Sequence, residues 1–403
     1  MSKRYNNHHK HDHCGNPWFS DSATKESEYA ERAKELGHTS LFTVNHGVTG
    51  RVFEWLELSK QYEMNMCYGT EAYFVPNRFE KDRSNKHVVI VAKNNDGYLQ
   101  LNDIMSEAHT TGFYWRPRID TELLFSLEPK NFIITSACVA GLWDEPELLF
   151  ALKQHFKDNF FLELQDHNFD LQKEVNQRML AFSQEAKIPV IHGNDSHYIH
   201  PSDSKYRTIY QRGKDVYFDD DNENTMILDY PTYEEIERRY AQQGILTVEQ
   251  VHTALENTLV FDTCEPITII NDEIKLPPFS KTPNEDLKKL INQGWKKARE
   301  KIPIERHQEY IKAIREEVDI VEKTNMANYF LIDNAVVNRA EKVYGGKLTN
   351  TGRGSSPSFY INKLLELTDI DRLDAPVTLF PSRFMSVERI LQTRSLPDLW
   401  IIM

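Results

Sequence analysis

Apolar and polar positions follow two periods in the first half of the chain. Short runs rich in β-branched and aromatic residues predict buried strands within residues 39–47, 64–75, 87–94, 132–141, 160–167 and 188–198. Residues 20–37 and 52–63 instead repeat apolar positions at helical spacing, and Ser20, Asp21 or Ser22 is the expected N-cap of the first helix. Strands that alternate with helices predict an α/β fold with a largely parallel sheet, wound open or closed as a barrel.

The second half of the chain is mainly helical in pattern. Residues 231–244 and 247–264 have helical spacing, and three prolines with few apolar residues in 275–286 predict a linker. Long amphipathic helices are expected beyond it, in residues 285–302, 306–325 and 329–343. We therefore predict two domains, residues 1–270 and 271–403.

Composition narrows the functional classes. The chain has 61 acidic and 48 basic side chains, a formal net charge of −13, which argues against a protein that coats DNA by bulk charge. Four cysteines without a CxxC pair argue against a disulfide-stapled secreted protein. The N-terminus lacks an apolar signal region, and no run of 18 apolar residues occurs. We expect a soluble, cytoplasmic protein that does not insert into a membrane.

Histidines are unevenly distributed. Thirteen of the 15 lie in the first half of the chain. The tract His8–His13 alone could be an expression tag or a solvated terminus, but other histidines and acids follow the predicted strands: His46, Glu71, Cys138, His167, Asp195 and His197. That rim of an α/β sheet or barrel is where active sites form. His87 is an exception, because it opens its strand.

These residue types suit a metal site. His11 and His13 are one residue apart on an extended segment and therefore point the same way, with Asp21 in the following loop. Asp195 and His197 repeat this alternation. A single histidine near a strand end is usually a hydrogen-bonded core residue, but burying the whole set without metal would leave many polar groups unpaired. Histidine, carboxylate and a lone thiolate are ligands that Zn, Mn and Fe share.

The motifs also occur in a family order. The segments HHKHDH, VNHG, GTEAY, HVVIVAKN, ITSACVAG, FLELQDH and GNDSHY resemble the polymerase-and-histidinol-phosphatase (PHP) domain. More narrowly, they resemble the PHP domain that opens the bacterial-type DNA polymerase III alpha family, the C-family replicases. The resemblance runs from about Tyr5 to Asp398. It implies a distorted (β/α) barrel, then a mainly helical segment and an incomplete α+β polymerase palm.

The resemblance implies a metal-ligand set and a chemistry. The ligands would be His11, His13, Asp21, His46, Glu71, His87, Cys138, His167, Asp195 and His197. Asn45 stands where the family usually has aspartate. The implied activity is metal-dependent phosphodiester hydrolysis, 3′→5′ removal of nucleotides from a primer end, with Asp195 and His197 in catalytic roles. Two alternatives stay open: a metal-stabilised scaffold without activity, and a free-standing PHP phosphoesterase for small substrates.

A second motif resembles the start of the polymerase palm. Gly352, Arg353, Gly354, Ser355 and Ser356 precede a predicted helix, where glycines, hydroxyls and a positive charge could cradle a triphosphate. Asp398 matches the first palm carboxylate, which would share Mg²⁺ with a second one, but Trp400 stands at that second position. We expect no primer extension by this chain alone.

The implied partners are primer–template DNA and either the remaining polymerase segment or other replisome proteins. The candidate basic contacts to DNA are Lys347, Arg353, Lys363, Arg383, Arg389 and Arg394.

Overall fold

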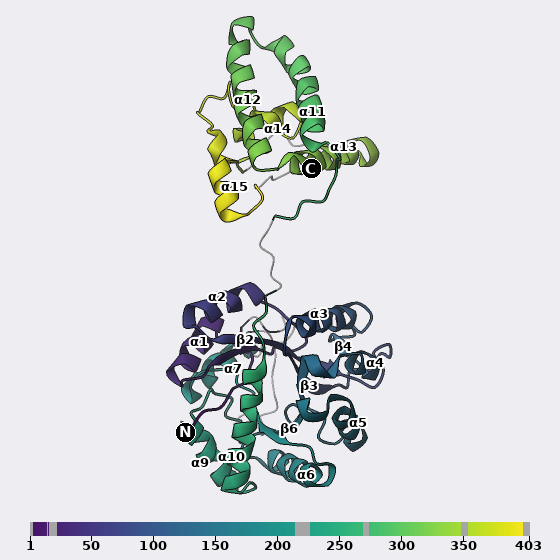
Figure 1. The fold of residues 1–403 in the computed structure, drawn as a ribbon, viewed down its shortest axis with the longest axis vertical. Coiled ribbons are helices and arrows are strands. Elements are labelled where there is room, and N and C mark those ends of the chain that lie inside the picture. The colour runs from purple at the N-terminus through teal and green to yellow at the C-terminus, as the bar shows by residue number, and fades with distance from the viewer. Residues whose placement is uncertain are drawn as a thin grey trace. The chain divides into compact units, whose positions relative to one another are not determined.

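The chain divides into two compact units, Met1–Ile269 and Ile270–Met403. The computed structural model describes residues 3–13, 15, 22–213, 226–268, 274–347 and 354–397. In Figure 1 the first unit runs from purple to green and contains the sheet, and the second runs from green to yellow. The division lies one residue from the domain boundary that the sequence predicts. In the described part of the chain, no helix is both long and apolar enough to cross a membrane.

The first unit is built on a curled sheet in the order β1-β2-β3-β5-β6-β7, with β4 paired to β2. Its strands are β1 (Ser40–Thr43), β2 (Asn65–Phe74), β3 (Lys86–Ala92), β4 (Arg118–Ile119), β5 (Phe132–Thr135), β6 (Phe160–Leu164) and β7 (Val190–His192). Its helices are α1 (Glu26–Glu35), α2 (Val52–Tyr62), α3 (Asn95–Thr110), α4 (Thr121–Phe125), α5 (Pro146–Phe156), α6 (Asp170–Ala186), α7 (Ser204–Arg212), α9 (Tyr233–Gln243) and α10 (Val248–Asn257). The α/β class is therefore as predicted.

The sheet is parallel except at β3, which is antiparallel to both β2 and β5. The stretch between β2 and β3 contains no helix, so the chain reverses directly instead of crossing over. This reversal explains the exceptional position of His87. Because β3 runs against its neighbours, its first residues lie at the same edge as the last residues of β2, and His87 pairs with Tyr73.

Side chains alternate between the two faces of the sheet. On β3, Val88 and Ile90 join a large core formed with the surrounding helices, whereas Val89 and Val91 join a smaller core on the inner face. The inner face is divided along its strands. Its apolar end holds Phe42, Cys67, Val89, Val91, Ile133, Phe161 and Ile191 with Phe261. By the same alternation, its polar end holds Glu71, Tyr73, His87, Thr135 and Glu163.

Helix α1 begins later than the sequence predicts. It starts at Glu26, where the Lys25 backbone N–H donates to the Glu28 carboxylate at 2.7 Å. Ser22, one of the predicted caps, instead donates its hydroxyl to the backbone carbonyl of His197 at 2.7 Å. The other two predicted caps, Ser20 and Asp21, lie outside the described residues. Ser22 and Thr24 thus bond to the backbone of His197 rather than cap the helix.

The described residues of the second unit form helices joined by irregular segments. It contains α11 (Pro283–Ala298), α12 (His307–Lys323), α13 (Ala327–Tyr344), α14 (Tyr360–Leu364) and α15 (Val387–Thr393), around a core that includes Ile291, Tyr310, Phe330, Phe359 and Phe384. No strand occurs within 274–347 or 354–397. Of the α+β palm that the resemblance implies, these residues form helical parts only.

A buried carboxylate joins three segments of this unit. Glu317 on α12 is almost fully buried and accepts hydrogen bonds from the backbone N–H groups of Tyr360 (3.0 Å) and Ile361 (2.8 Å), at the start of α14. Arg372 donates to the same carboxylate at 2.6 Å. The negative charge is therefore placed where a helix N-terminus and a guanidinium both favour it.

We predict that Glu317→Ala destabilises the second unit strongly. The substitution leaves the buried Arg372 guanidinium and two amides without their partner, a loss on the order of 3–5 kcal/mol in the free energy of unfolding. Hydrogen exchange of residues 307–364 across a urea series measures it. Glu316→Ala is the matched control, because that side chain is 62% exposed. Equal protection in the two variants would contradict the prediction.

Candidate metal centre

The N-terminal segment lies beside the chain that follows β7. Lys10 and Ser196 form a parallel bridge, in which the His11 N–H donates to the Ser196 carbonyl at 2.8 Å and the Ser196 N–H donates to the His9 carbonyl at 3.1 Å. Alternation on both segments sends the flanking side chains to one side. Four potential ligands therefore converge: His9, His11, Asp195 and His197.

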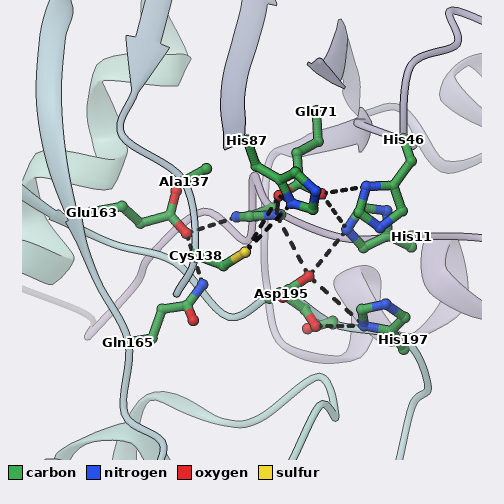
Figure 2. A network of polar contacts seen from close by, with 12 residues as sticks. His11, His46, Glu71, His87, Ala137, Cys138, Glu163, Gln165, Asp195 and His197 are labelled. Atoms are coloured by element: carbon green, nitrogen blue, oxygen red, sulfur yellow. Dashed lines mark hydrogen bonds and ion pairs between the residues drawn. The ribbon is translucent and has the colours of Figure 1, made fainter. Parts of the chain in front are cut away.

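Glu71 meets this group from β2. Its carboxylate lies 3.2 Å from His9 Nε2 and 3.2 Å from His11 Nε2, while Asp195 Oδ1 lies 3.0 Å from His11 Nε2 and 3.5 Å from His9 Nε2. Figure 2 shows Glu71 and Asp195 on opposite sides of this centre, with His197 next to Asp195. One donor atom from each of His9, His11, Glu71 and Asp195 fits within a group no wider than 4.8 Å.

Two further histidines and a cysteine contact the same two oxygens of the Glu71 carboxylate. His46 Nδ1 lies 2.8 Å and His87 Nδ1 lies 2.9 Å from its two oxygens, and these three residues form a second converging group. The Cys138 Sγ lies 3.5 Å from Glu71 Oε1 and 3.6 Å from His87 Nδ1. A third group combines His11, His46 and His197. Glu71, His11 and His46 each belong to two of these three groups, so the overlapping donors offer more than one place for a cation.

A second carboxylate holds the first histidine in place. Glu163 Oε1 lies 2.6 Å from His9 Nδ1 and accepts from Gln165, and its other oxygen accepts from Thr135 at 2.6 Å. A Cβ at Gly193 would lie 2.1 Å from the Glu163 carboxylate, so only glycine leaves room for it. A carboxylate on the far ring nitrogen fixes the tautomer and direction of a ligating histidine, leaving His9 Nε2 toward the centre.

The charges of the centre depend on one another. Burial alone would raise the pKa of Glu71, but His87, His46 and His9 outweigh it and hold that pKa well below its usual range. Burial likewise opposes the charged form of His9, yet Glu163, Glu71 and Asp195 raise its pKa well above the ordinary value. Burial raises the pKa of the Cys138 thiol. The low pKa of Glu71 thus favours its ionised form, although the site is almost completely buried.

The donor set fits a divalent cation. Among the described residues, His9 Nε2, His11 Nε2, Glu71 Oε2 and Asp195 Oδ1 are buried and lack a hydrogen-bond partner. Buried polar atoms without partners are costly, and a cation shared by these atoms would satisfy them. Nitrogen and carboxylate donors with one thiol suit Zn, Mn or Fe.

His13, a predicted ligand, is not part of this centre. After His11 the chain leaves Ser196, and the His13 N–H donates to the Thr24 carbonyl at 2.8 Å. The His13 side chain joins a separate group with Asp12 and Glu26, in which its Nδ1 lies 3.3 Å from Glu26. His9 takes the predicted place of His13 at the centre. The sequence already indicated His9 as an alternative ligand, because His9 and His11 have the same spacing as His11 and His13.

Three other predicted positions have different outcomes. His167 is buried and burial lowers its pKa to about 4, but none of the converging groups among the described residues contains it. Asn45, in place of the family's aspartate, binds Asp12 through both ends of its amide at 3.0 Å. Asp21 lies outside the described residues. Glu163 was missed because it lies within a strand, where a lone acid gives no spacing signal.

The predicted phosphate loop is described only in part. Gly354 is exposed with a φ of 68°, whereas Ser356 is buried and its carbonyl accepts from Asn362 at 3.0 Å. The first two amides of α14 donate to Glu317 and are therefore already bound. Gly352, Arg353 and Asp398 lie outside the described residues. A nucleotide-binding role for Gly352–Ser356 and Asp398 stays a prediction.

We predict that His9 contributes more to metal affinity than His13. His9→Ala removes a donor from the central group, so the affinity of the full chain for Mn²⁺ or Zn²⁺ should fall by about 100-fold or more, since even changes behind a ligand cost about 10- to 100-fold. His13→Ala should leave the tightest site nearly unchanged. Competition titration against a chromogenic chelator measures both. A larger loss in His13→Ala than in His9→Ala would contradict this assignment.

Comparisons with known proteins match each unit to a family. Residues 9–167 match the PHP domain, and residues 286–401 match the bacterial DNA polymerase III alpha NTPase domain. A solved structure described as a candidate metal-dependent phosphoesterase from Bifidobacterium adolescentis covers 59% of this chain and 98% of its own, with 14% identity and a TM-score of 0.34. That likeness is too low to carry an argument.

Similar curated proteins share one description, DNA polymerase III subunit alpha. Those from Aquifex aeolicus and Helicobacter pylori strain 26695 are 26% and 27% identical and align with 94% of this chain and 34% of their own length. The one from Deinococcus radiodurans is 31% identical over 46% of this chain and 15% of its own. The chain spans about a third of the length of the first two relatives. It is thus similar along most of its length to the N-terminal part of DNA polymerase III alpha subunits, with a PHP domain first and the alpha-subunit NTPase domain second.

Proposed function

We propose that the chain is the N-terminal part of a replicative DNA polymerase of the III alpha type, and that its first unit hydrolyses phosphodiesters. The reaction would be 3′→5′ removal of nucleotides from a primer end. The observation that carries the proposal is the convergence of buried donor atoms from His9, His11, Glu71 and Asp195 that lack a hydrogen-bond partner. The similarity to DNA polymerase III alpha subunits supports DNA as the substrate.

The residues divide into three roles. His9, His11, His46, Glu71, His87, Cys138, Asp195 and His197 would hold the cations, which we expect to be Zn, Mn or Fe. Such cations supply Lewis acidity toward a phosphoryl oxygen and make water a stronger nucleophile near neutral pH. Glu163 orients His9 from behind. Asp195 and His197 would keep the catalytic roles that the resemblance implies, and Asp195 has 12% of its side chain exposed whereas the Glu71 side chain is fully buried.

The same proposal covers partners and the second unit. Primer–template DNA and the other proteins of a replisome are the expected partners, because the relatives are polymerase subunits of about three times the matched length. Residues 1–270 would form the hydrolytic domain, and residues 271–403 would form a linker, a helical segment and the truncated start of the polymerase palm. In the described part of that second unit, the hydrogen bonds to Glu317 join α12 to the start of α14 and to Arg372.

We predict nucleotide release from a 3′-labelled primer by the purified chain with Mn²⁺ or Zn²⁺. The double variant His11→Ala/Asp195→Ala should lose activity by at least about 100-fold, as two donors of the central group are removed. His252→Ala is the matched control, since this exposed histidine pairs with Glu237. Denaturing electrophoresis of the labelled strand follows the reaction.

The outcomes separate hydrolysis from a structural role for the metal. If metal binds with high affinity but no tested cation gives release, the centre is a scaffold and the hydrolytic proposal is wrong. If release persists in the double variant, the activity belongs to another site or a contaminant. Release by the wild type and by His252→Ala, together with loss in the double variant, supports the proposal.

A further inference from the structure

Exposed aromatic and basic side chains gather next to the metal centre. They come from the loop before β3 and from the turn between α3 and β4. Trp115 is 59% exposed and Phe113 is 44% exposed, and the Arg83 guanidinium lies 3.8 Å from the centroid of the Trp115 ring. We define the Trp115 surface as Arg83, Phe113, Trp115 and Arg116. Single exposed rings are common on proteins, but a contiguous exposed aromatic patch is typical of an interaction site.

Direct contacts link this surface to the metal ligands. The Arg116 guanidinium lies over the Tyr73 ring at 5.4 Å, and Tyr73 in turn stacks on His46 with ring centroids 5.7 Å apart. Tyr73 also meets His87 edge-on at 5.3 Å. His87 has 15% of its side chain exposed, more than the other members of its converging group. The Trp115 surface therefore continues into the side of the centre that opens to solvent.

The surface is held rigidly. The buried Arg118 guanidinium donates to four backbone carbonyls, two of them in Arg78 and Gly112, and so joins the loop before β3 to the turn after α3. His109 Nε2 lies 2.9 Å from the Gly47 carbonyl, next to His46, and its ring stacks on Phe113. Trp115 itself has a φ of 63°, at the tip of the bridge between Tyr114 and Arg116. A rigid platform loses little entropy on binding.

We infer that the Trp115 surface binds a single-stranded nucleic acid and directs its end to the metal centre. Bases would stack on Trp115 and Phe113, and phosphates would contact Arg83 and Arg116. Aromatic platforms flanked by arginines bind single strands in this way without regard to sequence. The inference deepens the proposed hydrolysis, because it names the surface that delivers the strand.

Position and charge favour a strand over a protein ligand. Arg83 covers part of the Trp115 face and leaves its guanidinium on the surface, where a phosphate can reach it without desolvating a buried charge. The acidic neighbours are engaged locally, Asp82 by Ser84 and Glu80 by Asn77. Those neutral partners orient the two carboxylates without removing their charge, so the positive charge that a polyanion would contact here comes from Arg83 and Arg116, on a chain whose net charge is −13. A duplex would hide the base faces that the exposed rings are suited to bind.

The test is strand binding by the full chain, measured apart from hydrolysis. The probe is a fluorescein-labelled oligothymidylate of about 12 nucleotides with a hydrolysis-resistant phosphorothioate at its 3′ end. Trp115→Ala should weaken binding by about 10-fold, since one stacked base is lost. Arg83→Gln should weaken binding and reduce its salt dependence. Phe150→Ala is the matched control, because this exposed phenylalanine on α5 is not part of the surface.

An abasic strand of the same length separates stacking from charge. It should bind Trp115→Ala and wild type equally, while Arg83→Gln still weakens its binding. If Trp115→Ala and Arg83→Gln both bind oligothymidylate with wild-type affinity, the inference is wrong. A protein partner would then be the better candidate for this surface. Circular dichroism of Arg83→Gln shows whether a loss reflects misfolding. Primer hydrolysis by the wild type is scored separately: if it fails while Trp115→Ala weakens binding, the proposed function falls and the surface assignment stands.

Discussion

The parallel pairing of Lys10 with Ser196 places the ligands of both segments around one point. Two backbone hydrogen bonds hold the segments together, and each segment contributes the side chains on either side of its bridging residue. Lys10 points the other way, where its ammonium group lies 4.3 Å from the Tyr29 ring centroid and 4.1 Å from the Trp55 ring centroid. These cation–π contacts stabilise the register that the centre needs, because a slip of one residue would turn the histidines away.

The inner face of the sheet must then accommodate a polar end and an apolar end. Burying Glu71, Glu163 and Asp195 together is unfavourable unless positive charge is close. Histidines meet part of this need, as the lowered pKa of Glu71 shows, and cations would meet the remainder. The apolar end around Phe261 carries no such requirement and anchors the strands by ordinary packing. Stability of the fold and occupancy of the centre are therefore expected to be coupled.

Much of this arrangement could be predicted from the sequence. Strand-end positions identify His46 and Asp195, because polar residues that end apolar runs must meet at the rim. Glu71 was identified in the same way, although it lies inside β2 on the inner face. The choice between His9 and His13 could not be made, since three alternating histidines are equivalent until the partner Ser196 is known. The antiparallel course of β3 was missed for a similar reason. The loop between β2 and β3 contains no helix, which indicates an antiparallel pair only once these two strands are known to be neighbours in the sheet.

Two kinds of side chain lie at this edge of the sheet: acidic and imidazole groups in the metal centre, and basic and aromatic groups on the Trp115 surface. Their separation explains how a chain with a net charge of −13 still presents positive charge next to the centre. Acidic and imidazole groups lie inside, where they balance one another, so the centre itself does not attract a phosphodiester from a distance. A nucleic-acid strand would therefore have to be held by residues outside the metal centre. Among the described residues near the opening, Arg83 and Arg116 supply positive charge and Trp115 supplies a stacking face. Tyr73 connects the two regions by contacting both Arg116 and His46. In the proposed function, strand binding and hydrolysis would therefore depend on neighbouring but distinct residues.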